Sequence, residues 1–142
     1  LEQETLKKET EAPEDSRKGS HTVLLVDDEE TIRVLGCRIL QKLGFNIWVA
    51  ADGPSALDVY RAHQDEISCV ILDLTMPLMD GEETFRELRK LNSGLPILMS
   101  SGYSEQEVVQ RFAGEGLSGF IQKPYQINEL SEKLKEVLVN QH

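Results

Sequence analysis

Short runs of apolar residues alternate with segments in which apolar residues recur at helical spacing, from residue 22 to the end of the chain. Runs of the first kind are typical of buried strands, and spacing of the second kind is typical of helices with one buried face. We expect strands at residues 22–26, 45–50, 68–72, 95–99 and 119–122. A helical pattern follows each strand. The sequence therefore predicts an α/β fold with (βα)5 order: a doubly wound, five-stranded parallel sheet with helices on both faces.

The first helix shows how these patterns are bounded. It is marked by four apolar residues at helical spacing, Ile32, Leu35, Ile39 and Leu43. Gly44 follows them, and glycine commonly ends a helix because it adopts a left-handed backbone without steric cost. We therefore expect the helix to stop there and the second strand to begin directly afterwards.

Residues 1–20 differ in composition from the rest of the 142-residue chain. Leu1, Leu6 and Ala12 are the apolar residues among them, and charged residues are dense. Such a segment buries too little surface to offset the entropy of ordering it. We expect a charged, disordered linker, with the fraying end of an upstream helix as the alternative, and one folded domain at residues 21–142. A chain that begins with Leu rather than Met is expected to be a fragment of something longer.

Charge and cysteine content narrow the function further. The formal net charge is −10, from 15 Lys and Arg against 25 Asp and Glu. We expect no nucleic-acid binding by this segment, because no basic surface is available to displace phosphate counterions. We expect no membrane contact by it either, since no apolar stretch reaches the roughly 18 residues of a membrane span. Cys37 and Cys69 fall in apolar runs, which predicts buried free thiols and a cytoplasmic location, although the parent protein could be anchored in a membrane.

Polar residues stand at the ends of four of the apolar runs. Asp27 and Asp28 follow the first strand, Asp73 follows the third, Ser101 the fourth and Lys123 the fifth. The carboxyl ends of parallel strands share one edge of a sheet, where ligand sites of such folds lie. Three carboxylates, a hydroxyl and an ammonium are thus expected to converge. Acids that hold a hard cation, beside an acid and a lysine that face a phosphoryl group, predict a phosphoryl-transfer site.

Four sequence strings carry a resemblance to a known family: VLLVDDEE, ILDLTMPLMDG, the serines that end PILMSS, and FIQKP. In this order the chain resembles the receiver domain of two-component response regulators, across about residues 21–140. The resemblance implies a flavodoxin-like fold and a phosphorylatable signalling switch. Such a module catalyses its own phosphorylation and dephosphorylation but does not turn over a substrate.

The resemblance implies a role for each strand-end acid. Asp73 matches the aspartate that accepts the phosphoryl group from a phosphohistidine. Asp28 matches the direct Mg²⁺ ligand and Asp27 the acid that holds the ion mainly through water. Asp73 and the backbone carbonyl of Thr75 would supply further oxygens. Mg²⁺ favours hard oxygen ligands of this kind, and Mn²⁺ is expected to substitute for it.

The remaining matches concern charge and switching. Lys123 matches the lysine that pairs with a phosphoryl oxygen, and Pro124 resembles the proline of the family's cis Lys-Pro bond. Ser101 matches the hydroxyl that hydrogen-bonds the phosphoryl group after transfer, with Ser100 as the alternative alignment. Phe120 occupies the switch aromatic position. Without a hydroxyl, its inward state would depend on packing alone.

The same resemblance implies which residues set the lifetime of the phosphoryl group and which proteins the domain binds. Thr75 and Tyr103 occupy positions that tune the lifetime of the phosphoryl group, and a bulky Tyr103 is expected to shield it from water. The donor would be a histidine kinase or a histidine phosphotransfer domain. Docking or homodimer formation is expected through the fourth and fifth strand–helix units, around Val108, Phe112 and Leu130.

The sequence is compatible with several kinds of protein that could contain this domain. Residues 100–105 resemble receivers attached to hybrid sensor histidine kinases, so the C-terminal receiver of such a kinase is the leading interpretation. A stand-alone single-domain regulator is the main alternative. An aspartate-nucleophile phosphatase would use an acid two residues after the nucleophile, a spacing that Asp27 and Glu29 approach. A phosphorylation-independent pseudo-receiver is disfavoured because every acceptor and metal position is filled.

Overall fold

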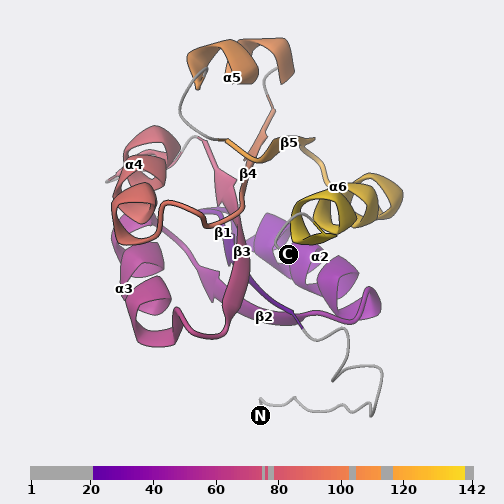
Figure 1. The fold of residues 1–142 in the computed structure, drawn as a ribbon. Coiled ribbons are helices and arrows are strands. Elements are labelled where there is room, and N and C mark those ends of the chain that lie inside the picture. The colour runs from indigo at the N-terminus through magenta and orange to yellow at the C-terminus, as the bar shows by residue number, and fades with distance from the viewer. Residues whose placement is uncertain (1–20, 75, 77–78, 103–104, 113–116, 140–142) are drawn as a thin grey trace.

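The computed structural model describes residues 21–74, 76, 79–102, 105–112 and 117–139. Five parallel strands form one sheet in the order β2-β1-β3-β4-β5 (Figure 1). The strands are β1 (Thr22–Val26), β2 (Asn46–Ala50), β3 (Ile67–Asp73), β4 (Ile97–Ser101) and β5 (Gly119–Gln122). The helices are α2 (Glu30–Lys42), α3 (Gly53–His63), α4 (Gly81–Leu91), α5 (Glu105–Arg111) and α6 (Ile127–Val139). This arrangement confirms the predicted doubly wound fold.

Helices cover both faces of the sheet, with α2 and α6 on one side and α3 and α4 on the other (Figure 1). Leu24 and Leu72 belong to the apolar cluster that contains Phe85 of α4. Leu25 and Ile71, their neighbours in the chain, belong to the cluster that contains residues of α2 and α6. Alternate residues of β1 and β3 therefore point to opposite faces, and both sets are fully buried, as in parallel sheets covered on two sides.

The bounds of three strands differ from the sequence prediction: β2 begins one residue later than predicted, β3 is one residue longer at each end, and β4 is shifted by two residues. β3 includes Asp73, which pairs in register with Ser100 of β4, so the acid is the last residue of the strand. β4 begins at Ile97, two residues later than predicted, and extends to Ser101. Pro96 precedes it and has no N–H to donate to a strand ladder, which explains the later start.

The buried face of α2 is also rotated relative to the predicted one. Gly36, Ile39 and Leu40 are its buried residues, whereas Leu35 is 37% exposed. Gly44 has a φ of 92°, the left-handed conformation expected of a glycine that ends a helix. No helix in the described part of the chain is both long and apolar enough to cross a membrane.

Gly81 begins α4 directly against the end of β3. A Cβ atom there would lie 2.3 Å from the backbone oxygen of Asp73 and 2.5 Å from Cα of Leu74. We expect Gly81→Ala to lower the free energy of unfolding by about 3 kcal/mol in urea denaturation, because backbone atoms have little room to yield. Gly94→Ala is the matched control, since its Cβ would meet Oδ1 of Asn92 at 3.7 Å. Equal losses in the two variants would contradict this steric account.

Candidate functional site

Three carboxylates meet at the carboxyl ends of two neighbouring strands. Asp27 directly follows β1 and Asp73 ends β3, and these strands pair in parallel. Asp28 is next in the chain, and ligand oxygens of the three acids lie within 4.8 Å of one another. Asp27 is fully buried and Asp73 nearly so, whereas Asp28 is exposed. The predicted convergence of acids at this edge of the sheet is confirmed.

The ammonium of Lys123 reaches both buried acids from beyond the edge strand β5. Its Nζ donates to Oδ2 of Asp27 at 3.0 Å and to Oδ1 of Asp73 at 3.2 Å. The backbone N–H of Lys123 donates to the carbonyl of Ser101 at 2.9 Å, which attaches this residue to β4. The Lys123–Pro124 peptide bond is cis, as predicted.

Burial and pairing have opposite effects on the charge of Lys123. Burial alone would lower the pKa of its ammonium, but the hydrogen bonds that it donates to Asp27 and Asp73 and the charges of these acids outweigh burial. The pKa is therefore raised above its ordinary value of 10.5. The lysine is charged at neutral pH and offsets part of the repulsion between the two acids.

Sequence reasoning missed two residues that border this cluster. Oε1 of Glu29 lies 3.9 Å from Nζ of Lys123, and the backbone N–H of Glu29 donates to Oδ1 of Asp27 at 3.0 Å. Arg33 donates from Nη1 to the backbone carbonyl of Asp27 at 2.8 Å. The position of Glu29 directly after two acids was a usable signal. Arg33 gave none, because an arginine in a helix usually indicates a solvated face.

The other predicted site residues belong to β4 and β5 or lie outside the residues that the structure describes. Ser101 is the last residue of β4, the strand next to β3, and is 2% exposed. Phe120 of β5 is 3% exposed and belongs to the apolar cluster on the α3 and α4 side. Thr75 and Tyr103 lie outside the described residues.

The donor set suits a hard divalent cation. Asp27, Asp28 and Asp73 offer carboxylate oxygens that are close enough to share one ion. Mg²⁺ takes such oxygens and keeps several waters, and the exposure of Asp28 leaves room for them. The residues present therefore fit a magnesium site held by these three acids.

Tyr125, two residues after Lys123 in the chain, is buried, and its hydroxyl donates to Oγ of Ser100 at 3.3 Å. Burial raises the pKa of this hydroxyl well above its ordinary value of 10.0; a hydrogen bond from the Ser100 hydroxyl to the phenolate would lower the pKa, and the charges of Asp27 and Asp73 raise it further. The folded protein thus keeps a proton that the unfolded chain loses. The stability from this group is complete below about pH 10 and is lost as the pH rises from there through the folded-state pKa.

Urea unfolding at a series of pH values from about pH 8 to about pH 11 tests this assignment. Wild type should lose up to about 1.4 kcal/mol per pH unit more than Tyr125→Phe above pH 10, because the phenylalanine has no proton to retain. Parallel stability curves for the two proteins would contradict the assignment.

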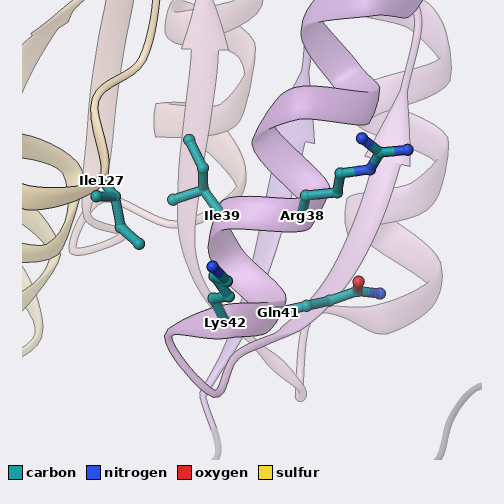
Figure 2. Close-up of a pocket in the computed structure, with 5 residues that line it drawn as sticks. All are labelled: Arg38, Ile39, Gln41, Lys42 and Ile127. Atoms are coloured by element: carbon teal, nitrogen blue, oxygen red, sulfur yellow. The ribbon is translucent and has the colours of Figure 1, made fainter.

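A separate hollow lies away from the carboxylates, between α2 and the start of α6. It is lined by Arg38, Ile39, Gln41 and Lys42 of α2 and by Ile127 of α6. Figure 2 shows Arg38 and Gln41 directed away from Ile127, with Ile39 between the two helices. It shares no lining residue with the acid cluster, so the chemistry of the site belongs to the strand ends rather than to this hollow.

Five parallel strands with helices on both faces, and buried acids that contact a lysine at the carboxyl ends of the strands, are typical of the receiver domains of two-component signalling. The sequence matches the response regulator receiver domain across residues 23–135. The chain belongs to this family, and the family resemblance seen in its motifs is confirmed.

Individual relatives show how the chain compares with longer and shorter members. The sensor kinase CckA of Brucella abortus is 37% identical over 123 residues, which cover 87% of this chain and 13% of the kinase. The chemotaxis protein CheY of Bacillus subtilis is 32% identical over 120 residues, which cover 84% of this chain and 98% of CheY. The structure of CheY4 from Vibrio cholerae superimposes with a TM-score of 0.78 at 31% identity, over 84% of this chain and 100% of that one. The match thus spans single-domain relatives almost completely and the kinase only in small part.

Proposed function

We propose that this receiver accepts a phosphoryl group from a phosphohistidine onto Asp73 and changes conformation in response. The observation that supports this most is the contact of one ammonium with two buried acids: Lys123 donates to both Asp27 and Asp73. A carboxylate nucleophile beside a positive charge is the arrangement that phosphoryl transfer requires, since catalysis is mainly positioning and charge stabilisation.

In the proposed transfer, an oxygen of Asp73 attacks phosphorus while the bond from phosphorus to the imidazole nitrogen breaks. The nitrogen keeps the electron pair, and an acyl phosphate forms on Asp73. Lys123 then donates to a phosphoryl oxygen in place of Asp73. A Mg²⁺ ion held by Asp27, Asp28, Asp73 and the carbonyl of Thr75 would neutralise charge on the phosphoryl oxygens.

The conformational response is assigned to residues near this edge of the sheet. The Ser101 hydroxyl donates to the phosphoryl group after transfer, and the buried Phe120 accompanies it as the aromatic part of the switch. Thr75 and Tyr103 control access of water to the acyl phosphate.

The partner is a histidine kinase or a histidine phosphotransfer domain, in keeping with the family. The 37% identity to the CckA sensor kinase favours a receiver within a hybrid kinase over a stand-alone regulator. The complete reading frame distinguishes the two settings. Val108, Phe112 and Leu130, around which the sequence suggested docking, are buried in the core. Contacts through the fourth and fifth strand–helix units must therefore use their exposed neighbours.

Incubation with acetyl phosphate tests the proposal, with Mg²⁺ or with excess EDTA. We expect one base-labile acyl phosphate per chain with Mg²⁺ and none in EDTA, measured by intact mass, with the adduct mapped to Asp73 after borohydride reduction. Multiple turnovers of acetyl phosphate without an adduct would indicate a phosphatase instead. No reaction and no binding of beryllofluoride would indicate a pseudo-receiver.

A further inference from the structure

A buried hydrogen bond joins Tyr125 to Ser100, the residue of β4 that pairs in register with Asp73. The two oxygens are 3.3 Å apart, and the residues are 5% and 0% exposed. The tyrosine ring lies against α2, where a Cβ at Gly36 would come within 3.2 Å of its Cε2 atom. A tyrosine hydroxyl in such a position is costly to bury without an acceptor, so Ser100 stabilises this placement of the ring.

The end of β4 holds both sides of the site through its backbone. The carbonyl of Ser100 accepts from the N–H of Leu74, the residue after Asp73, at 3.0 Å. The carbonyl of Ser101 accepts from the N–H of Lys123 at 2.9 Å. Tyr125 in turn is bound to Oγ of Ser100. The turn at residues 123–125 is therefore attached to β4 through both its first residue, Lys123, and its third residue, Tyr125.

We infer that Tyr125 and Ser100 are positioning residues for Lys123, because their hydrogen bond holds the 123–125 turn where the ammonium reaches Asp27 and Asp73. This inference rests on the proposed function. A lysine side chain is a flexible four-carbon stem, so the place of its backbone decides which oxygens the ammonium can reach. Without the bond, the turn is free to shift and Lys123 spends less time on a phosphoryl oxygen.

Two binding constants separate this role from general loosening of the fold. Beryllofluoride stands in for the phosphoryl group on Asp73, where Lys123 contacts it, whereas Mg²⁺ alone requires the acids. In calorimetric titrations we expect Tyr125→Phe to weaken beryllofluoride binding at saturating Mg²⁺ by about three- to ten-fold, the usual effect of one hydrogen bond. The Kd for Mg²⁺ alone should stay the same or become tighter, because a looser lysine competes less for the acids.

Tyr60→Phe is the matched control. Tyr60 is a buried tyrosine of α3 whose hydroxyl accepts from Nδ2 of Asn92 at 3.0 Å. The variant loses the same group at a place with no connection to the 123–125 turn, so both binding constants should equal those of wild type.

A double-variant cycle tests the pairing itself. Ser100→Ala should weaken beryllofluoride binding at least as much as Tyr125→Phe, because it leaves a buried hydroxyl without its acceptor. The double variant should be no weaker than Ser100→Ala, since partners in one bond are not additive. Additive effects, equal weakening of Mg²⁺ and beryllofluoride, or wild-type affinity in Tyr125→Phe would each overturn the inference. If wild type itself bound no beryllofluoride with Mg²⁺, the proposed function would fall and the inference with it.

Discussion

Asp73→Asn is expected to abolish acyl phosphate formation completely. An amide oxygen at this position is a poor nucleophile and cannot form the mixed anhydride, and no described residue beside it duplicates its place at the end of β3. Intact-mass spectrometry after incubation with acetyl phosphate and Mg²⁺ should show the adduct in wild type and none in the variant. Retention of the adduct in Asp73→Asn would place the acceptor elsewhere.

The same variant should remain folded, which makes the loss of reaction interpretable. Replacing Asp73 by a neutral amide removes one of two acids that share Lys123, so repulsion falls while the contact between Lys123 and Asp27 remains. Asp52→Asn is the control: Asp52 caps α3 by accepting from the N–H of Ser55, and asparagine caps helices about equally well. It should be phosphorylated like wild type.

Lys123→Met should cause a large loss of stability. The variant leaves Asp27 and Asp73 buried side by side without their shared ammonium, and breaking such a pair costs about 3–5 kcal/mol. In urea denaturation with EDTA we expect the free energy of unfolding to fall by about 3 kcal/mol. This is the lower end of that range, because the lysine side chain is 16% exposed and water reaches it. Added Mg²⁺ should recover part of this loss, since the ion binds the folded acids preferentially.

Lys90→Met is the control for losing a lysine as such. Lys90 pairs with Glu87 on the surface of α4 and is 71% exposed, and such pairs contribute about 0–1 kcal/mol. A Lys123→Met variant as stable as Lys90→Met in EDTA would show that the buried acids do not depend on the lysine.

The acids and the lysine could be predicted because their positions depend on strand ends alone. Asp27 and Asp73 stand at the ends of runs that are apolar on both faces, and Lys123 directly follows the last predicted strand. Once the strands are parallel, their carboxyl ends meet without any knowledge of side-chain packing. The same reasoning gave the layer order of the fold.

Contacts that depend on helix rotation or on strand pairing could not be predicted in this way. Leu40 rather than Leu35 is buried in α2, and the close contact between Gly36 and the ring of Tyr125 is invisible to spacing within the helix. The bond between Ser100 and Tyr125 likewise joins residues of two separate units. Local patterns carry no information on which side chains two docked elements bring together.

The bond between Lys123 and Asp27 spans 96 residues of sequence, nearly the whole folded domain. Acids of the first and third strands therefore meet their lysine only after the fifth strand has been made and has docked at the far edge of the sheet. Closing so long a loop is among the slower steps of folding. During synthesis, a chain that still lacks its C-terminal unit would hold Asp27 and Asp73 without their lysine, so the proposed reaction at Asp73 requires the completed domain.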